Sequence, residues 1–138
     1  MRKRTLSREF ALQILYQLDI TGDTPERALE NFWANKEGEE IETALKEFSS
    51  ELVKGVAGNL EEIDKKIVQF AANWQLKRMA VVDRNIMRLG AFELLYREDI
   101  PPKVAINEAV ELAKKFSGLE SGKFVNAILD KVKLEKNK

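Results

Sequence analysis

The helical pattern is strongest in residues 83–130, which read DRNIMRLGAFELLYREDIPPKVAINEAVELAKKFSGLESGKFVNAILD. Apolar residues recur there every three or four positions, which is the period of one face of an α-helix. Pro101 and Pro102 interrupt the pattern because proline cannot continue a helix, and a turn containing Gly118 and Gly122 interrupts it again. This stretch therefore predicts three amphipathic helices.

The same period continues through the remainder of the chain. We predict helices over residues 5–19, 24–33, 40–58, 59–74, 76–98, 104–116 and 121–132. No window of the sequence alternates as a β-strand does. The predicted fold is all-α, with about seven helices in two small bundles that share one core. We place them in a single helical domain over 1–138, with a three-helix half over 1–58 and a four-helix half over 59–138.

Three local features sharpen these predictions. Thr24 before Pro25 is a favourable N-cap with proline at the first helical position, and Asn59 with Glu62 has the spacing of a capping box. Gly90 lies inside a predicted helix, where glycine costs about 1 kcal/mol relative to alanine. That cost is offset where a neighbouring helix approaches closely, so we expect such a contact at Gly90.

The composition excludes most enzymatic sites. The chain has no cysteine and no histidine, so it lacks thiolate metal sites, disulfides, and the commonest general base and metal ligand. A hydrophobic fraction of 44% with 33% charged residues is typical of a soluble helical protein. No apolar run approaches the roughly 18 residues that a membrane span needs. We therefore expect a cytoplasmic protein that is not an enzyme and has no cofactor, no metal and no membrane contact.

Charge is balanced overall but segregated at the N-terminus. Lys plus Arg and Asp plus Glu number 23 each, so a nucleic-acid site must come from local charge. The first eight residues contain no acid and four cations, which are Arg2, Lys3, Arg4 and Arg8. In helical projection, Tyr16 falls on the solvent side beside Glu9 and Gln13. Cations with an exposed ring are the ingredients of single-stranded RNA binding, and an ordinary solvated face has the same composition.

A second candidate is the segment from Gly118 to Phe124. Its two glycines are separated by three residues, not four, and Phe124 stands where a phosphate loop needs Ser or Thr, so we exclude nucleoside triphosphate binding. The start of a helix favours a phosphate through its free N–H groups and its dipole. Lys123 and Phe124 would add a cation and a stacking ring. The alternative is a buried Phe124 beside a solvated Lys123.

Two further polar groups lie on predicted helices. The first comprises Asn107, Glu108 and Glu111, and the second comprises Asp83, Arg84, Asn85 and Arg88. Glu111 and Lys115 have the i,i+4 spacing of a surface ion pair, so we do not assign catalysis to the first group. The mixed charges of the second group suit a protein partner and suit solvent equally well. The aromatic residues expected in the core of the N-terminal half are Phe32, Trp33 and Phe48.

The order of these motifs resembles the NusB family of transcription antitermination factors. The resemblance is strongest in the run VAINEAVELAK over 104–114 and in KFVN over 123–126. It extends to the first predicted helix and, in the middle of the chain, to Trp74 and to residues 82–84 and 88–89. The chain departs from the family at Ala127, where glycine is usual, and at residues 5–7, which interrupt the family's arginine-rich start. The resemblance implies an all-helical fold of two small bundles.

The resemblance also implies a role in transcription. Members of the family bind the boxA element of nascent ribosomal RNA transcripts together with the ribosomal protein NusE. This heterodimer joins the RNA polymerase elongation complex through other Nus factors and suppresses termination. The RNA contacts carried over to this chain are Arg2, Lys3, Arg4, Arg8, Tyr16, Lys123 and Phe124. The NusE contacts carried over are Phe70 and Asp83.

Our leading hypothesis is a non-catalytic antitermination factor that binds boxA-containing single-stranded RNA and NusE. The alternative is a helical protein–protein adaptor without a specific RNA site of its own. A third hypothesis is a stand-alone relative of the helical domain attached to some rRNA cytosine methyltransferases. The 138 residues contain no methyltransferase segment, so we expect that the chain is not itself that enzyme.

Overall fold

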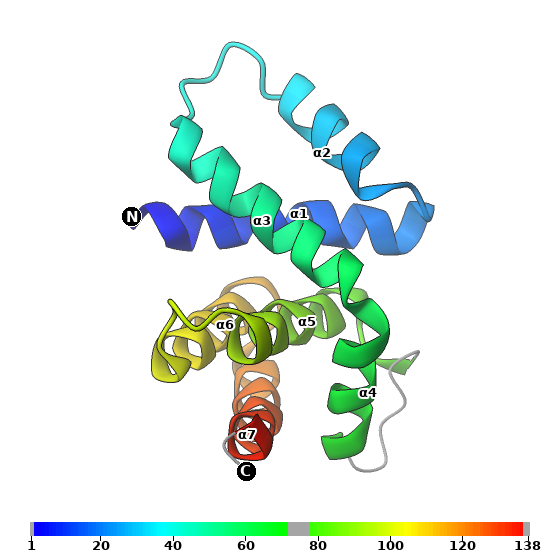
Figure 1. The fold of residues 1–138 in the computed structure, drawn as a ribbon, viewed down its shortest axis with the longest axis vertical. Helices are drawn as coiled ribbons and strands as arrows, with labels where there is room; N and C mark the ends of the chain where they lie inside the picture. Colours follow the sequence, from blue (N-terminus) through cyan, green and yellow to red (C-terminus); the bar gives the residue numbers. More distant parts are fainter. Residues whose placement is uncertain (1, 72–77, 137–138) are drawn as a thin grey trace. The chain divides into compact units, whose positions relative to one another are not determined.

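The structure, a computed structural model, describes residues 2–71 and 78–136. Within these ranges it contains seven α-helices and no β-strand, which confirms the all-α prediction. The helices are α1 (Lys3–Thr21), α2 (Pro25–Ala34), α3 (Thr43–Gly58), α4 (Leu60–Phe70), α5 (Val81–Tyr96), α6 (Pro102–Phe116) and α7 (Leu119–Lys136) (Figure 1). They form two compact units, with α1–α3 in residues 1–58 and α4–α7 in residues 59–138. A single domain with one shared core stays a prediction.

In the first unit, α1 packs against α2 and α3. Ile14 of α1 and Leu52 of α3 are fully buried in its core. Two buried serines also join these helices. Ser49 Oγ donates to the carbonyl oxygen of Ser7 at 2.8 Å, and Ser7 Oγ donates to the carbonyl oxygen of Leu45 at 3.0 Å. Because a buried polar group without a partner costs about 1–3 kcal/mol, these bonds favour one register of α1 on α3.

Aromatic side chains pack edge to face between α1 and α2. The ring centroid of Phe10 lies 5.6 Å from that of Phe32 and 5.6 Å from that of Trp33, and the last two rings are 5.0 Å apart. Such edge-to-face pairs are favourable beyond the area they bury. Phe32 and Phe48 are buried, as predicted, whereas Trp33 is only half-buried. Trp33 is therefore partly a surface residue.

In the second unit, α5 is the central helix and packs against α4, α6 and α7. All its residues from 85 to 94 are buried, as expected for a helix with neighbours on every side. A Cβ built on Gly90 would lie 2.5 Å from Leu129 Cδ1 of α7 and 3.2 Å from Ala109 Cβ of α6. This confirms the close helix contact predicted at Gly90.

Most helix ends follow from local chemistry. Thr24 Oγ1 accepts the backbone N–H of Arg27 at 3.2 Å, which confirms the predicted N-cap of α2. Pro102 begins α6, two positions before the predicted start, because proline is tolerated in the first turn of a helix. Gly118 adopts a φ of 153°, which favours glycine, and α7 begins directly after it, not at residue 121. The fifth helix was predicted to start at residue 76, which lies outside the described residues. Within the described residues, α5 begins at Val81.

The helix α4 differs from its prediction at its N-terminus. Asn59 precedes it, but its side chain makes no cap hydrogen bond, so the predicted capping box is wrong. The φ of −125° and ψ of 21° at Asn59 are outside the extended conformation that an N-cap side chain uses. At the other end, α4 stops at Phe70, and Trp74, predicted near its end, lies outside the described residues. No helix in the described ranges is both long and apolar enough to cross a membrane.

Replacing Gly90 with alanine tests the close contact of α5 with α6 and α7. We expect Gly90→Ala to lower the free energy of unfolding by about 1–3 kcal/mol, the usual effect of overpacking a core. This loss should outweigh the gain in helix propensity of about 1 kcal/mol. Urea unfolding followed by circular dichroism measures the difference. Gly58→Ala is the control, because a Cβ on Gly58 meets nothing within 4 Å. Equal stability of the two variants would contradict the contact.

Candidate nucleic-acid interface

The N-terminal end of α1 carries an exposed basic group, formed by Arg2, which precedes the helix, and by Lys3 and Arg4 in its first turn. Lys3 Nζ lies 2.8 Å from a carboxylate oxygen of Glu42, and both side chains are exposed. Such a pair contributes at most about 1 kcal/mol, so a phosphate can replace Glu42 at little cost. The guanidinium carbon of Arg4 lies 4.2 Å from the ring centroid of Phe48, a cation–π contact that ties it to α3. Sequence reasoning missed Glu42, because it is 39 positions from Lys3.

Arg8 is buried, unlike the other three cations. Its exposed fraction is 2%, and its guanidinium carbon lies 5.4 Å from the ring centroid of Phe48. The residues three, four and seven positions further along the same face of α1 are also buried, namely Ala11, Leu12 and Leu15. The face that carries Arg8 therefore points into the protein. Of the four N-terminal cations, Arg2, Lys3 and Arg4 are exposed and Arg8 is not.

Tyr16 lies on the solvent side of α1, as the helical projection predicts. Its exposed fraction is 39%, and Gln13 and Gln17 beside it are exposed as well. Glu9, which the projection placed on the same side, is instead buried. The ring of Tyr16 is thus accessible among neutral side chains, with the nearby carboxylate of Glu9 removed from the surface.

Lys123 and Phe124 lie in the second turn of α7, not at its start. The backbone N–H of Gly122 already donates to the carbonyl oxygen of Gly118 at 3.1 Å, so the start of α7, where a phosphate site was predicted, lies before Gly122. The phosphate site itself stays a prediction. Lys123 Nζ lies 3.5 Å from a carboxylate oxygen of Glu120, and its side chain is 77% exposed. Phe124 is half-buried. What remains for a ligand is an exposed cation beside a partly accessible ring.

Phe124 shares a pocket of about 290 Å³ with Asp83. The residues that line it are Met79, Ala80, Asp83, Glu120, Ser121 and Phe124. Asp83 Oδ2 accepts a hydrogen bond from Ser121 Oγ at 3.2 Å, which links α5 to α7. Asp83 Oδ1 is buried and has no hydrogen-bond partner among the described residues. Because an unpaired buried acceptor is costly, this oxygen is suited to a donor from a ligand or partner.

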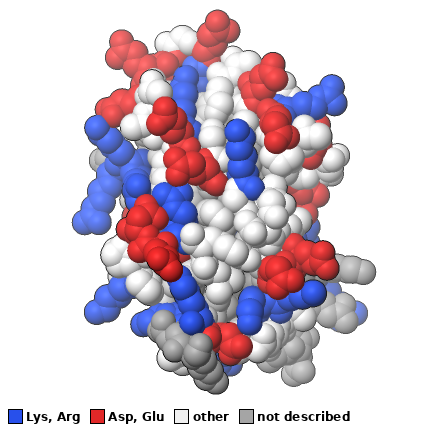
Figure 2. Space-filling view, in the orientation of Figure 1, with Lys and Arg blue, Asp and Glu red and all other residues white. Residues whose placement is uncertain are grey.

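The structure therefore brings the predicted partner contact Asp83 together with the predicted RNA contact Phe124. The basic group and Tyr16 belong to the first unit, and Lys123 and Phe124 belong to the second. Phe70 is the half-buried last residue of α4, and it is not among the described residues that line the pocket of Asp83. On the face drawn in Figure 2, basic and acidic side chains are interspersed, in keeping with the zero net charge.

Comparison with known proteins connects this arrangement to one family. The sequence model of the NusB family matches residues 5–133. The chain is 49% identical over 139 residues to the transcription antitermination protein NusB of Myxococcus xanthus (strain DK1622), covering 100% of this chain and 99% of that protein. The chain belongs to the NusB family.

Solved NusB structures have the same fold. NusB of T. maritima is 36% identical, with a TM-score of 0.85 over 96% of this chain and 91% of that chain. A chain in the crystal structure of antitermination factors NusB and NusE in complex with dsRNA is 29% identical. Its TM-score is 0.87, over 98% of each chain. The likeness extends over nearly the whole NusB-family chain and is not confined to one motif.

Part of the mixed polar group on α5 is internal in this NusB-family chain. Asn85 and Arg88 are buried. Arg88 Nε donates to Asp64 Oδ1 at 2.8 Å, and Arg88 Nη2 donates to Asp64 Oδ2 at 2.9 Å. Arg88 Nη1 donates to Asn85 Oδ1 at 3.2 Å, and Asn85 Nδ2 donates to the carbonyl oxygen of Val81 at 2.9 Å. The interpretation of Asn85 and Arg88 as a partner or solvent surface is wrong, because both are buried: Arg88 joins α5 to α4, and Asn85 bonds to Arg88 and to Val81 within α5.

The other polar group predicted in the sequence is at the surface of α6. Glu111 forms an exposed ion pair with Lys114, with 3.5 Å between the charged atoms, and Asn107 is exposed. In the described part of the chain, no group of three or more acidic side chains could hold a metal ion.

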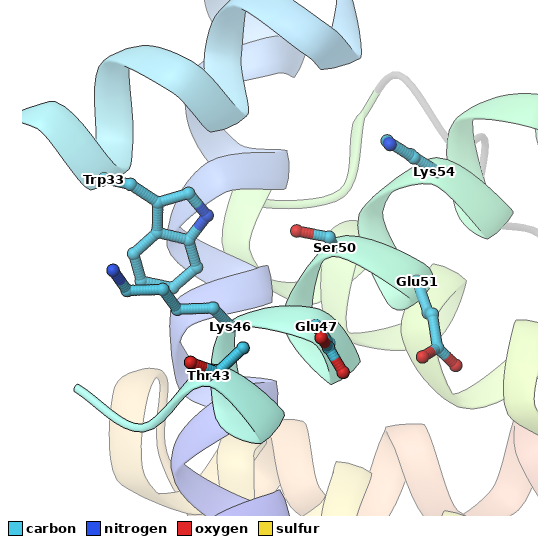
Figure 3. Close-up of a pocket in the computed structure, with 7 residues that line it drawn as sticks. All are labelled: Trp33, Thr43, Lys46, Glu47, Ser50, Glu51 and Lys54. Atoms are coloured by element: carbon cyan, nitrogen blue, oxygen red, sulfur yellow. The ribbon is translucent and has the colours of Figure 1, made fainter.

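A second pocket, of about 410 Å³, lies between α2 and α3 in the first unit (Figure 3). The residues that line it are Trp33, Thr43, Lys46, Glu47, Ser50, Glu51 and Lys54. Trp33 Nε1 is buried and has no hydrogen-bond partner within the described ranges. Lys46 Nζ lies 5.7 Å from the ring centroid of Trp33. The lining contains none of the predicted RNA or NusE contacts.

Removing Asp64 tests whether the pair with Arg88 stabilises the second unit. We expect Asp64→Ala to lower the free energy of unfolding by about 3 kcal/mol, because it leaves a buried guanidinium without its carboxylate. Chemical unfolding monitored by circular dichroism measures the loss. Glu61→Ala, on the same helix, removes an exposed carboxylate that lies 3.8 Å from Lys65 Nζ, and it should change stability by less than about 0.5 kcal/mol. A similar small effect for both variants would show that the buried pair is not stabilising.

Proposed function

We propose that this chain is a transcription antitermination factor that binds RNA together with the ribosomal protein NusE. The observation that supports the proposal is the match over 98% of both chains to a chain in the crystal structure of antitermination factors NusB and NusE in complex with dsRNA. We propose further that the bound RNA is the boxA element of ribosomal RNA transcripts. The assembled complex then joins the elongating RNA polymerase through other Nus factors.

In the first unit, the proposed RNA contacts are Arg2, Lys3, Arg4 and Tyr16. The three cations are exposed at one helix end, where they can bind the phosphates of a flexible strand. The accessible ring of Tyr16 can stack on an unpaired base, since every base has an aromatic face. Arg8 is assigned a supporting role, because its buried guanidinium and that of Arg4 share the ring of Phe48.

In the second unit, Lys123 and Phe124 are the proposed RNA contacts, and Phe70 and Asp83 are the proposed NusE contacts. Lys123 is highly exposed, and its pair with Glu120 is a weak surface pair that a phosphate can displace. The unpaired oxygen of Asp83 suits an N–H donor from NusE. None of these roles needs catalysis, and the sequence lacks the histidine and cysteine that most catalytic sites use.

One observation favours a protein–protein adaptor as a second candidate. The ring of Phe124 lies in a pocket that two carboxylates line, those of Asp83 and Glu120. Carboxylates repel phosphate and attract a partner's cation, so this pocket suits a protein ligand better than an RNA backbone. In the adaptor hypothesis, the chain binds NusE but does not prefer boxA RNA over a scrambled sequence.

RNA titrations with ring-removing variants separate these two functions. We expect Tyr16→Ala to weaken boxA binding by about 1–3 kcal/mol if a base stacks there. Phe124→Leu, which keeps an apolar side chain in the half-buried site, should also weaken boxA binding. Fluorescence anisotropy with labelled boxA RNA and a scrambled control, with and without NusE, measures both.

Tyr96→Ala is the matched control for Tyr16→Ala. It removes an equally exposed ring at the end of α5, where Tyr96 stacks on Phe92. Thermal unfolding of each variant shows whether the fold is retained. If folded Tyr16→Ala and Phe124→Leu both bind boxA as the unmodified protein does, these residues are not RNA contacts. Equal affinity of the unmodified protein for boxA and scrambled RNA would favour the adaptor.

Binding to NusE should depend on Asp83. We expect Asp83→Ala to weaken NusE binding by about 1.5–3 kcal/mol, the contribution of a hydrogen bond to a charged group. Isothermal titration calorimetry without RNA measures the change. Asp130→Ala removes an exposed carboxylate of α7 and serves as the control. If the two substitutions change NusE affinity equally, Asp83 is not a NusE contact.

A further inference from the structure

The last turn of α6 places a lysine across the beginning of α7. A Cβ built on Gly122 would lie 3.0 Å from Lys114 Cγ and 3.6 Å from Lys114 Cε. The aliphatic part of the Lys114 side chain therefore runs over the backbone of Gly122, which is buried beneath it. The ammonium group is one bond beyond Cε and lies 3.5 Å from a carboxylate oxygen of Glu111 on α6. Lys123 directly follows Gly122 in the sequence.

We propose that Lys114 binds an RNA phosphate next to Lys123, and that Gly122 positions it for this role. The inference rests on the proposed RNA-binding function and extends the site from α7 to α6. Lys114 is not among the RNA contacts predicted from the sequence. Its side chain is 45% exposed, so its charged end is accessible although its stem is packed.

The packing of its stem makes Lys114 a better phosphate ligand than an ordinary surface lysine. A free lysine side chain loses much rotamer entropy when it binds. Lys114 has already lost part of that freedom in the folded protein, because its stem lies on Gly122. Fewer conformations remain to be given up when a phosphate binds, and this lowers the cost of the contact.

The charges around Lys114 favour an anion over a cation. The end of α6 and the first turns of α7 carry three exposed lysines, Lys114, Lys115 and Lys123, and two exposed acids, Glu111 and Glu120. Both acids are already in surface ion pairs at 3.5 Å, Glu111 with Lys114 and Glu120 with Lys123. A phosphate can exchange with these carboxylates because exposed pairs are weak. An RNA backbone is the occupant that continues the proposed contact at Lys123.

The salt dependence of boxA binding, measured on the full chain with NusE, tests the role of Lys114. We expect Lys114→Ala to weaken binding about twofold to fivefold at low salt, the size of an exposed ion pair. It should also reduce the slope of log K against log salt by about 0.7, the value for one phosphate of a single strand. Lys103→Ala is the control, because it removes an exposed lysine near the other end of the same helix. It should change neither quantity.

Gly122→Ala tests the positioning role. The added methyl group would displace the Lys114 stem, so we expect a loss of RNA affinity similar to that of Lys114→Ala. Alanine favours a helix over glycine, so thermal stability should not fall. In a protein that already carries Lys114→Ala, adding Gly122→Ala should have no further effect on RNA binding. Additive losses in this double-mutant cycle would overturn the positioning role.

The outcomes separate this inference from the proposed function. If the unmodified protein does not prefer boxA over scrambled RNA, the proposed function fails. If it does, and Phe124→Leu weakens binding while Lys114→Ala behaves like Lys103→Ala, only the phosphate role of Lys114 fails. A loss of NusE affinity on Lys114→Ala, with RNA binding unchanged, would also overturn the inference, because the ligand would then be an acidic group of the partner.

Discussion

At Gly90, the backbone of α5 comes so close to α7 that one added carbon would lie 2.5 Å from Leu129 Cδ1. A second contact between the same helices is the hydrogen bond from Ser121 to Asp83. Asp83 precedes Gly90 by seven residues, and Ser121 precedes Leu129 by eight. Because both steps correspond to similar rises of about 10–12 Å along a helix, α5 and α7 run in the same direction. The contact at Gly90 thus brings the start of α7 against the start of α5, where the pocket of Phe124 lies.

The cations of this chain show what sequence periodicity can and cannot predict. The sequence predicts the helices and the cap at Thr24, because they depend on residues that are near in the chain. It also predicts the close contact at Gly90, because that contact depends on the absence of a side chain. The burial of Arg8 and Arg88 depends on partners far along the chain. Asp64 is 24 positions from Arg88, and Phe48 is 40 positions from Arg8. From the sequence alone, a charged residue is predicted to be at the surface. Its burial can be predicted only when the group that contacts its charge is known.

The candidate site was predictable to a similar extent. The accessible ring of Tyr16 follows from helical projection, because it depends only on the angle between residues of one helix. The pocket that joins Asp83 to Phe124 does not follow, since it needs α5 and α7 to meet. Resemblance to a family identified both residues but assigned them to different ligands. Only the three-dimensional structure shows that Asp83 and Phe124 line the same pocket.

This shared lining has a consequence for how RNA and NusE would bind together. The carboxylates of Asp83 and Glu120 line the pocket of Phe124, while Lys123 of the same helix turn is exposed beside it. A phosphate on the lysines would be repelled by these carboxylates. A partner that donates a hydrogen bond or a cation to Asp83 would reduce the repulsion and so strengthen RNA binding. Because such coupling is reciprocal, bound RNA would strengthen the binding of that partner by the same factor.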